Sequence, residues 1–169
     1  MANSVYVIRK AEVDDIRGIS ELLVRLKKLN GEFDPMFKVV SNVIEEAESY
    51  TRETMGSDKD IVLVAKVEKK IVGLIKAVLK DRRFYEPVIQ GIIVDLYVLP
   101  ENRRGKLGED LLNSMMNALK QRGVEIVTAE FPTQNTLAIN FYQKQGFRAL
   151  VSTFAKTFPN DLILKKSDY

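Results

Sequence analysis

The sequence predicts one α/β domain that spans residues 1–169. Amphipathic helical patterns alternate with apolar strand patterns along the chain, an arrangement typical of α/β folds. The length suits one domain with a substantial core, and 46% of the residues are hydrophobic, as in soluble globular proteins. Neither an internal repeat nor a Gly/Pro-rich linker divides the chain, so we expect no second domain.

The first half of the chain predicts five elements from the spacing of its apolar residues. Apolar residues alternate in strands and recur every three or four residues in helices. These elements are a strand over residues 5–11, a helix capped by Asp14 or Asp15 and running to Leu29, a polar helix over residues 41–55, and strands over residues 61–67 and 71–79. Asn30 and Gly31 are expected to end the first helix, because glycine favours the backbone conformation of a C-cap.

The second half predicts the longest strand, two further helices and three shorter strands. These elements are the long strand over residues 88–99, a helix over 106–122 that stops at Gly123, a strand over 125–131, a helix from Asn135 or Thr136 to Gln145, and C-terminal strands over 147–157 and 161–165. The leucines and methionines of helix 106–122 fall on one face. We therefore expect its methionines, Met115 and Met116, to belong to the core.

The chain contains neither cysteine nor histidine. This composition excludes disulfides, thiolate nucleophiles, the Ser-His-Asp mechanism and the commonest zinc ligands, and no metal is expected. Any proton transfer near neutral pH must therefore use carboxylates, tyrosine, lysine or water.

Charge and hydropathy restrict the partners and the location of the protein. The formal net charge is only +3, and most basic residues are interleaved with acidic ones, so we expect no nucleic-acid binding. The apolar stretches are shorter than a membrane span, and the N-terminus lacks the pattern of a signal peptide. These features predict a cytoplasmic protein without membrane attachment.

A basic, glycine-containing loop connects strand 88–99 to the helix that follows it. The loop consists of Pro100, Glu101, Asn102, Arg103, Arg104, Gly105, Lys106, Leu107 and Gly108. Unpaired backbone N–H groups, two guanidinium groups and the positive end of a helix dipole together favour a phosphate or pyrophosphate. The spacing is neither that of a P-loop nor that of a dinucleotide fold. The alternative interpretation is a surface turn with a basic tip.

This loop and the region after strand 125–131 resemble two motifs of the GNAT superfamily, the acyl-CoA-dependent N-acyltransferases. The first motif, Gln/Arg-x-x-Gly-x-Gly/Ala, is matched at Arg103 and Gly108, whereas Lys106 replaces its first glycine. The second motif, Asn-x-x-Ala-x-x-Phe-Tyr-x-x-x-Gly-Phe, is matched by Asn135, Ala138, Phe141, Tyr142, Gly146 and Phe147. Residues 8–11 and a glycine within a strand, Gly73, are also usual in the family. The resemblance therefore covers nearly the whole chain.

The resemblance implies a fold, a co-substrate and a set of binding residues. The implied fold is a central mixed sheet of about seven strands with helices on both faces, opened where the fourth and fifth strands part, and a homodimer is common in the family. The implied partners are acetyl-CoA and an amine acceptor. The residues implied for binding acetyl-CoA are Arg103, Arg104, Gly105, Lys106, Leu107 and Gly108 at the pyrophosphate, the backbone of Leu96 to Val98 along the pantetheine arm, and Asn135 and Tyr142.

The resemblance also implies two catalytic groups. A backbone N–H near Val98 is expected to stabilise the negative charge that develops on the thioester oxygen. Tyr142 matches the tyrosine that donates a proton to the departing thiolate, a step for which a phenol with a pKa of about 10 is suitable. The alternative interpretation is that Tyr142 is a half-buried packing residue of an amphipathic helix.

Two carboxylates, Asp95 and Glu130, are candidates for removing the proton of the amine. Asp95 lies within the apolar run Ile92–Leu96, where a charge is costly unless it has a function or a partner. Glu130 ends the next strand beside the basic loop. The alternative for Asp95 is a buried salt bridge with a lysine or arginine of a neighbouring strand.

Together these features predict an N-acetyltransferase that transfers acetyl from acetyl-CoA to a primary amine of a small molecule or a protein. The first alternative is a non-catalytic domain that binds or senses acyl-CoA and makes no use of Tyr142. The second alternative, a basic nucleic-acid module, is disfavoured because the loop has no aromatic residues among its basic ones.

Overall fold

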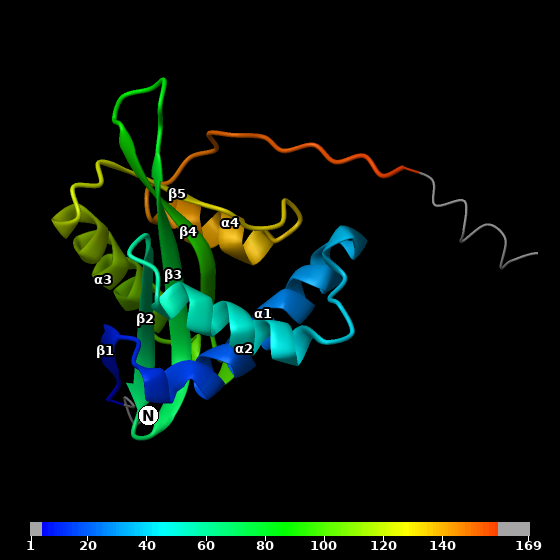
Figure 1. Ribbon diagram of the computed structural model, residues 1–169, viewed down its shortest axis with the longest axis vertical. Coiled ribbons are helices and arrows are strands. Elements are labelled where there is room, and N and C mark those ends of the chain that lie inside the picture. Colours follow the sequence, from blue (N-terminus) through cyan, green and yellow to red (C-terminus); the bar gives the residue numbers. More distant parts are fainter. Residues whose placement is uncertain (1–4, 159–169) are drawn as a thin grey trace, which may run out of the picture.

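A computed structural model describes residues 5–158, which form a five-stranded mixed sheet in the order β1-β2-β3-β4-β5 (Figure 1). Neighbouring strands are antiparallel from β1 to β4, and β5 is parallel to β4. The strands are β1 (Val7–Lys10), β2 (Asp60–Val67), β3 (Lys70–Asp81), β4 (Ile89–Val98) and β5 (Ile126–Ala129). The helices are α1 (Ile16–Phe33), α2 (Val43–Met55), α3 (Leu107–Gln121) and α4 (Thr136–Lys144).

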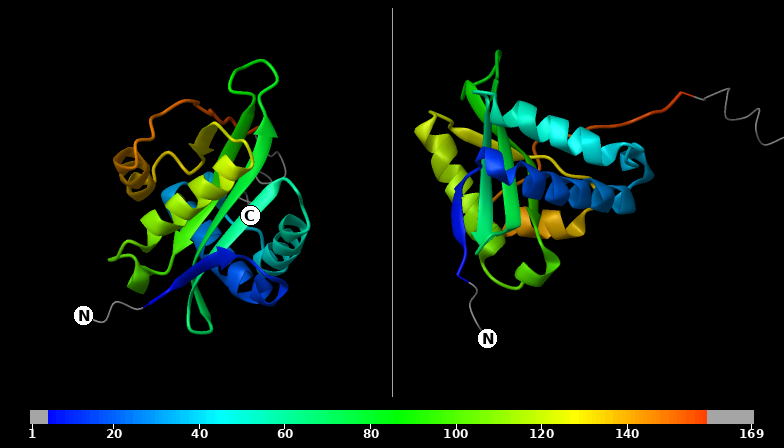
Figure 2. Two further views of the ribbon diagram at one scale, coloured as in Figure 1. Left: turned by 90° about the vertical axis from the view of Figure 1, so that its left-hand side faces the viewer. Right: turned by 60° about the horizontal axis from the view of Figure 1, so that its bottom comes forward.

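The helices form a layer on each face of the sheet. Helix α3 covers one face, while α1, α2 and α4 lie on the other (Figure 2). The apolar rows of α1 and α3 fill the two layers between helices and sheet, as the spacing predicts. Met115 is fully buried in this core, but Met116 is exposed, so the expectation that both methionines are core residues is wrong for Met116. A step of one residue turns a helical side chain by about 100°, away from the core.

Helix α1 is longer than the sequence indicates. The expected stop at Asn30 and Gly31 is wrong, because the helix continues to Phe33 and ends at Asp34. Gly31 instead permits a close contact, since a Cβ atom there would lie 3.2 Å from the carbonyl oxygen of Phe37. The glycine therefore allows the loop after α1 to fold back against the helix.

The sheet has fewer strands than the expected seven. Residues 147–157 form no strand, and the expected strand over 161–165 lies outside the described residues. A strand needs a hydrogen-bonding neighbour, and within residues 5–158 the segment 147–157 has none. The longest strand is β3 with 12 residues rather than β4 with 10, because β3 pairs with β2 over residues 70–78 and with β4 over residues 73–81.

Strands β4 and β5 part as the fold class predicts. Their parallel pairing ends at Ile93 of β4 and Ala129 of β5. Beyond this point one hydrogen bond continues it, in which the Glu130 N–H donates to the Ile93 carbonyl oxygen at 3.0 Å. At the same level the register between β3 and β4 shifts, which leaves Val94 as an extra residue in β4. Such a bulge bends a strand, and β4 runs on to Val98 without β5 beside it.

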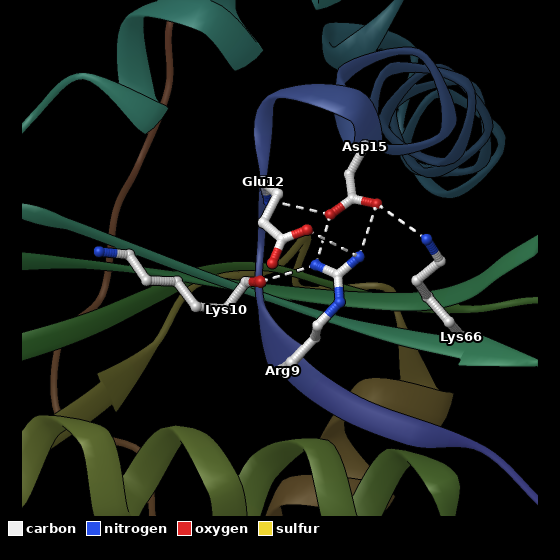
Figure 3. A network of polar contacts seen from close by, with 5 residues as sticks. All are labelled: Arg9, Lys10, Glu12, Asp15 and Lys66. Atoms are coloured by element: carbon white, nitrogen blue, oxygen red, sulfur yellow. Dashed lines mark hydrogen bonds and ion pairs between the residues drawn. The ribbon is translucent and has the colours of Figure 1, made fainter. Parts of the chain in front are cut away.

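A buried carboxylate fastens the start of α1 to the first two strands (Figure 3). Asp15 accepts hydrogen bonds from both terminal nitrogens of Arg9, at 2.6 and 3.1 Å, and from Lys66 at 3.3 Å. The backbone N–H of Glu12 donates to the same carboxylate at 2.9 Å. Burial alone would raise the pKa of Asp15, but these hydrogen bonds outweigh it and hold the pKa below its ordinary value.

Residues 5–158 contain neither a membrane-spanning helix nor a metal-binding cluster of acidic side chains. None of the helices in this range is long and apolar enough to traverse a bilayer. Nor does the described part of the chain bring three or more acidic side chains together in a group that could hold a metal ion.

Candidate active site

The gap between β4 and β5 exposes backbone hydrogen-bonding groups. The Leu99 N–H donates to the Val72 carbonyl oxygen at 2.9 Å, and Val98 is paired with Gly73. In an antiparallel ladder this pattern makes Val98 and Gly73 a pair that exchanges no hydrogen bonds, so the N–H and C=O of Val98 point away from β3. The same alternation applies to Leu96. Both residues therefore direct their backbone groups toward the gap.

The basic loop lies at the end of β4 and leads into α3. Arg103 is held in place, because its Nε donates to the Val98 carbonyl oxygen at 2.8 Å and its guanidinium lies 5.1 Å from the centre of the Tyr97 ring. Arg104, Gly105 and Lys106 are exposed. The positive charge of Arg103 is therefore fixed beside the end of β4, and Arg104 and Lys106 add further positive charge on the loop.

The N-terminus of α3 is open to an anion. The N-cap residue, Lys106, makes no side-chain capping bond, and the first backbone hydrogen bond of the helix runs from Asp110 to Lys106. The amide groups of the first turn are therefore without capping side chains, which is the arrangement that binds phosphate groups. The acidic side chain of Asp110 is engaged by Tyr6, the residue immediately before β1, whose hydroxyl donates a hydrogen bond to it.

The two sequence motifs meet at this point. A Cβ atom on Gly108, at the start of α3, would lie 3.6 Å from the ring of Phe141 in α4. Helices on opposite faces of the sheet thus come into contact where the strands have parted. Asn135 caps α4 as expected, because its side chain accepts a hydrogen bond from the Ala138 N–H at 3.0 Å.

Tyr142 has a buried ring and an unengaged hydroxyl. The ring is stacked on Phe131 at 5.3 Å and meets Phe141 and Phe147 edge-on at 5.2 Å each, and the residue is only 7% exposed. Within residues 5–158 the hydroxyl makes no hydrogen bond, and no buried polar side-chain atom lacks a partner, so the hydroxyl reaches the surface. Burial, together with the charge of Asp95, raises the pKa of Tyr142 above its ordinary value of 10.0.

Asp95 accepts hydrogen bonds within a buried network of polar side chains. Its fully buried side chain accepts from Lys27 Nζ of α1 at 2.5 Å and from the Tyr50 hydroxyl of α2 at 3.4 Å. The salt bridge that the sequence offers as an alternative is therefore present, but its cation comes from a helix rather than from a neighbouring strand. Lys76 of β3 pairs instead with Asp60, at 2.9 Å, and donates to the Tyr50 hydroxyl.

Glu130 is placed differently from Asp95. Its backbone continues the β4–β5 pairing for one more step, and its side chain is exposed at the point where the strands separate. A carboxylate in this position can exchange protons with solvent. Glu130 and Asp95 therefore both lie where the strands separate, but the side chain of Glu130 is exposed to water and that of Asp95 is buried.

Sequence reasoning missed three members of the network, namely Lys27, Tyr50 and Lys76. A signal for Lys76 was present, since it is a lone charge within the apolar strand over residues 71–79, as Asp95 is within its own strand. Burial, and the charges of Asp95 and Asp60, raise the pKa of Tyr50. Nothing in the local pattern distinguishes Lys27 or Tyr50 from other polar residues on helices.

Comparison with known proteins agrees with this geometry. Residues 26–147 match the model of the Acetyltransferase (GNAT) family. An uncharacterized N-acetyltransferase from Archaeoglobus fulgidus is 26% identical over 141 residues, which cover 83% of this chain and 92% of that protein.

Solved structures share the fold over nearly their whole length. A variant of the BH1408 protein from Bacillus halodurans superposes with a TM-score of 0.79 and 20% identity, covering 90% of this chain and 99% of that one. The aminoglycoside N-acetyltransferase AAC(6')-Iy, solved in complex with CoA, gives a TM-score of 0.74 and 13% identity over 93% of this chain and 97% of its own.

Proposed function

The chain belongs to the GNAT family of acetyltransferases, and on this basis we propose that it transfers acetyl from acetyl-CoA to a primary amine of a small molecule or a protein. One observation carries the proposal. The backbone groups of Leu96 and Val98 face a gap that is bordered by the basic loop and by the uncapped start of α3. Extended backbone groups beside an anion site suit a ligand that has both an amide-containing arm and a pyrophosphate.

The residues present fit acetyl-CoA. The amides of Leu107 and Gly108 and the side chains of Arg103, Arg104 and Lys106 would hold the pyrophosphate, with Gly105 leaving room for the backbone to approach. Leu96 and Val98 would pair with the pantetheine arm, and Asn135 and Tyr142 would border its end. When bound, acetyl-CoA supplies an acetyl group that is activated as a thioester.

Two groups of this chain act on the charges that develop during transfer. The Val98 N–H, directed into the gap, donates a hydrogen bond to the thioester oxygen as it becomes negative. Tyr142 gives its proton to the sulfur as the carbon–sulfur bond breaks and the new carbon–nitrogen bond forms. Because burial and the charge of Asp95 raise its pKa, the phenol carries its proton at neutral pH.

The amine must lose a proton before or during its attack, because free amines have a pKa near 10. We assign this proton to Glu130, whose exposed carboxylate can accept it directly or through water. Asp95, already bonded to Lys27 and Tyr50, acts as a positioning residue that holds α1 and α2 against the end of β4. Its charge also raises the pKa of Tyr142.

A thiol-release assay with acetyl-CoA and a panel of amines and lysine peptides tests the proposal. We expect micromolar binding of acetyl-CoA by calorimetry, and release of free CoA that depends on an added amine. Binding without turnover on any amine would favour the acyl-CoA sensor, and failure to bind would refute the site.

A further inference from the structure

Lys27 of α1 lies at the boundary between the buried polar network and solvent. Its ammonium is 2.5 Å from the carboxylate of Asp95, which is completely buried, whereas the Lys27 side chain is 42% exposed. Asp95 also accepts a hydrogen bond from the Tyr50 hydroxyl, so its negative charge is shared between two donors. The pair therefore presents its cation, and not its carboxylate, to an approaching ligand.

The ammonium of Lys27 also has donors that remain free. An ammonium has three N–H donors, and within residues 5–158 the one hydrogen bond of Lys27 is that to Asp95. The buried Lys76, by contrast, uses its ammonium inside the protein on Asp60 and Tyr50. Lys27 is thus the lysine of this network whose charge a ligand can reach.

Lys27 lies near the place where acetyl transfer is proposed to occur. Asp95, which holds Lys27, immediately precedes Leu96, whose backbone faces the gap between the strands. Helices α1 and α4 cover the same face of the sheet (Figure 2). Burial, and then the charge of Asp95, raise the pKa of Tyr142, so Asp95 is close enough to act on that hydroxyl. An acceptor whose amine reaches the thioester beside Tyr142 therefore comes within reach of Lys27.

A carboxylate contributes the opposite charge at the same opening. The N–H of the exposed Glu130 donates to the Ile93 carbonyl oxygen, and Asp95 follows Ile93 by two residues, at most roughly 7 Å along β4. Lys27 on α1 and Glu130 at the end of β5 thus border one opening with charges of opposite sign. A ligand that matches both carries an ammonium and an anionic group a few bonds apart.

We propose that the acceptor is an amine that also carries an anionic group, a carboxylate or a phosphate, and that Lys27 binds this group. The inference rests on the proposed function, because it concerns the acceptor of that reaction. The amine is directed toward Glu130, while the anionic group accepts charge-assisted hydrogen bonds from the free N–H donors of Lys27. An acceptor with a second ammonium in place of the anion is disfavoured, since Lys27 repels it.

Acceptors that differ in a single group test this selectivity. We expect the wild-type kcat/KM to be at least fivefold higher for 4-aminobutanoate or 3-aminopropyl phosphate than for butylamine, and lower for 1,4-diaminobutane than for butylamine. The carboxylate and phosphate arms decide which anion is preferred. The preference should shrink as salt is added, because Lys27 is partly exposed and its charge is screened.

Three variants separate the charge of Lys27 from its structural contact with Asp95. Lys27→Gln should abolish the preference, and the matched control Lys28→Gln, at an exposed lysine of the same helix, should keep it. Asp95→Asn removes the counter-charge and keeps the cation, so the preference should persist or increase even though the network is weakened. The double variant Lys27→Gln/Asp95→Asn leaves neither charge of this pair behind, and it gives the same test of lost preference if Lys27→Gln alone does not fold.

A binding measurement gives a readout that does not depend on turnover. In an NMR titration of the CoA-loaded protein, butanoate, which has no amine, should bind the wild type at least fivefold more tightly than Lys27→Gln. Equal kcat/KM for 4-aminobutanoate and butylamine, or a preference that Lys27→Gln retains, would overturn the proposal. If no amine is acetylated at all, the proposed function fails, and Lys27-dependent binding of butanoate then decides separately whether the anion site exists.

Discussion

Among single residues, charged side chains within apolar strands are the most informative about this protein. Asp95 and Lys76 are 2 and 4% exposed, in neighbouring strands, and each is charged. An unpaired charge in such a place would cost several kcal/mol, so both must have partners. Lys27 and Asp60 supply the opposite charges, and Tyr50 connects the two pairs. The network therefore joins helices α1 and α2 to three strands of the sheet.

We expect Asp95→Asn to lower the free energy of unfolding by about 1–3 kcal/mol, because Lys27 and Tyr50 lose a charged acceptor. As a positioning residue, Asp95 should leave the shape of the pH–rate profile unchanged when it is replaced. Glu130→Gln should instead depress the rate mainly at neutral pH and recover part of it at high pH, where free amine is abundant. Thermal unfolding and pH profiles of both variants check this assignment, and the reverse pattern would make Asp95 the base.

Tyr142→Phe should lower kcat by about ten- to a thousandfold and leave the affinity for acetyl-CoA nearly unchanged, since it removes one proton donor and no packing. Because the pKa of Tyr142 is raised, the wild-type rate should not fall as the pH approaches the ordinary tyrosine value of 10.0. Steady-state kinetics and calorimetry measure both effects. Tyr85→Phe, at an exposed tyrosine in the β3–β4 loop, is the matched control. Unaltered turnover in Tyr142→Phe would reduce Tyr142 to a packing residue.

Arg104→Glu should weaken the binding of acetyl-CoA at least tenfold, because it replaces an attractive charge beside the pyrophosphate with a repulsive one. The difference from the wild type should shrink as salt is added, since exposed charges are screened. Arg83→Glu, on the β3–β4 loop, makes the same change of charge away from the site and should bind like the wild type. Equal affinities for the two variants would show that the basic loop is only a surface turn.

At the scale of elements, the position of α1 depends on one buried carboxylate in the turn that precedes it. Asp15 receives hydrogen bonds from Arg9 of β1 and Lys66 of β2, and it lies immediately before the first residue of α1. This contact fixes how the helix enters the layer that also contains Lys27. The network around Asp95 is thus built on a helix whose start is itself anchored.

Asp15→Asn should lower the free energy of unfolding at neutral pH by about 1–3 kcal/mol. The pKa of Asp15 is lowered in the folded state, so its stabilisation is complete above the unfolded value of 3.8 and is lost as the pH falls through the folded value. The variant should therefore lose less stability than the wild type on acidification below that pH. Glu12→Gln, at an exposed partner of Arg9, should change the stability by under about 0.5 kcal/mol. Parallel acid-unfolding curves for wild type and Asp15→Asn would contradict this prediction.

For the whole molecule, the opening between β4 and β5 is the feature that connects fold and function. It leaves β4 without a neighbour on the β5 side over residues 94–98, and it brings the start of α3 to the ring of Phe141 in α4. A sheet closed along its full length would have neither property. The bulge at Val94 and the end of β5 at Ala129 therefore determine where the sheet opens.

Acetyl-CoA at about 100 times its dissociation constant should stabilise the protein by roughly 2.7 kcal/mol, which corresponds to a melting temperature higher by roughly 5–11 °C. Amide hydrogen exchange should slow in residues 94–98 and 104–109 on binding and stay unchanged in β1 and β2. Free adenosine, which lacks the pyrophosphate and the pantetheine arm, is the control ligand. Protection elsewhere, with none at the gap, would place the ligand outside the proposed site.

The sequence by itself determined the order of the elements, the two motifs and the absence of histidine and cysteine chemistry. These features are local, because helix and strand periodicity, the Asn135 cap and the basic loop depend on neighbours within a few residues. The family could be identified from them for the same reason.

Only the tertiary structure decided the number of strands, the end of α1 and the partners of Asp95. Lys27 and Tyr50 lie 68 and 45 residues away from Asp95 in the chain, so no local pattern could pair them. A strand forms only where the backbone pairs with a neighbouring strand, and within residues 5–158 the segment expected as a strand over 147–157 is not paired with one. Pairing between distant segments is a property of the packed molecule, because it depends on which surfaces meet after the elements have formed.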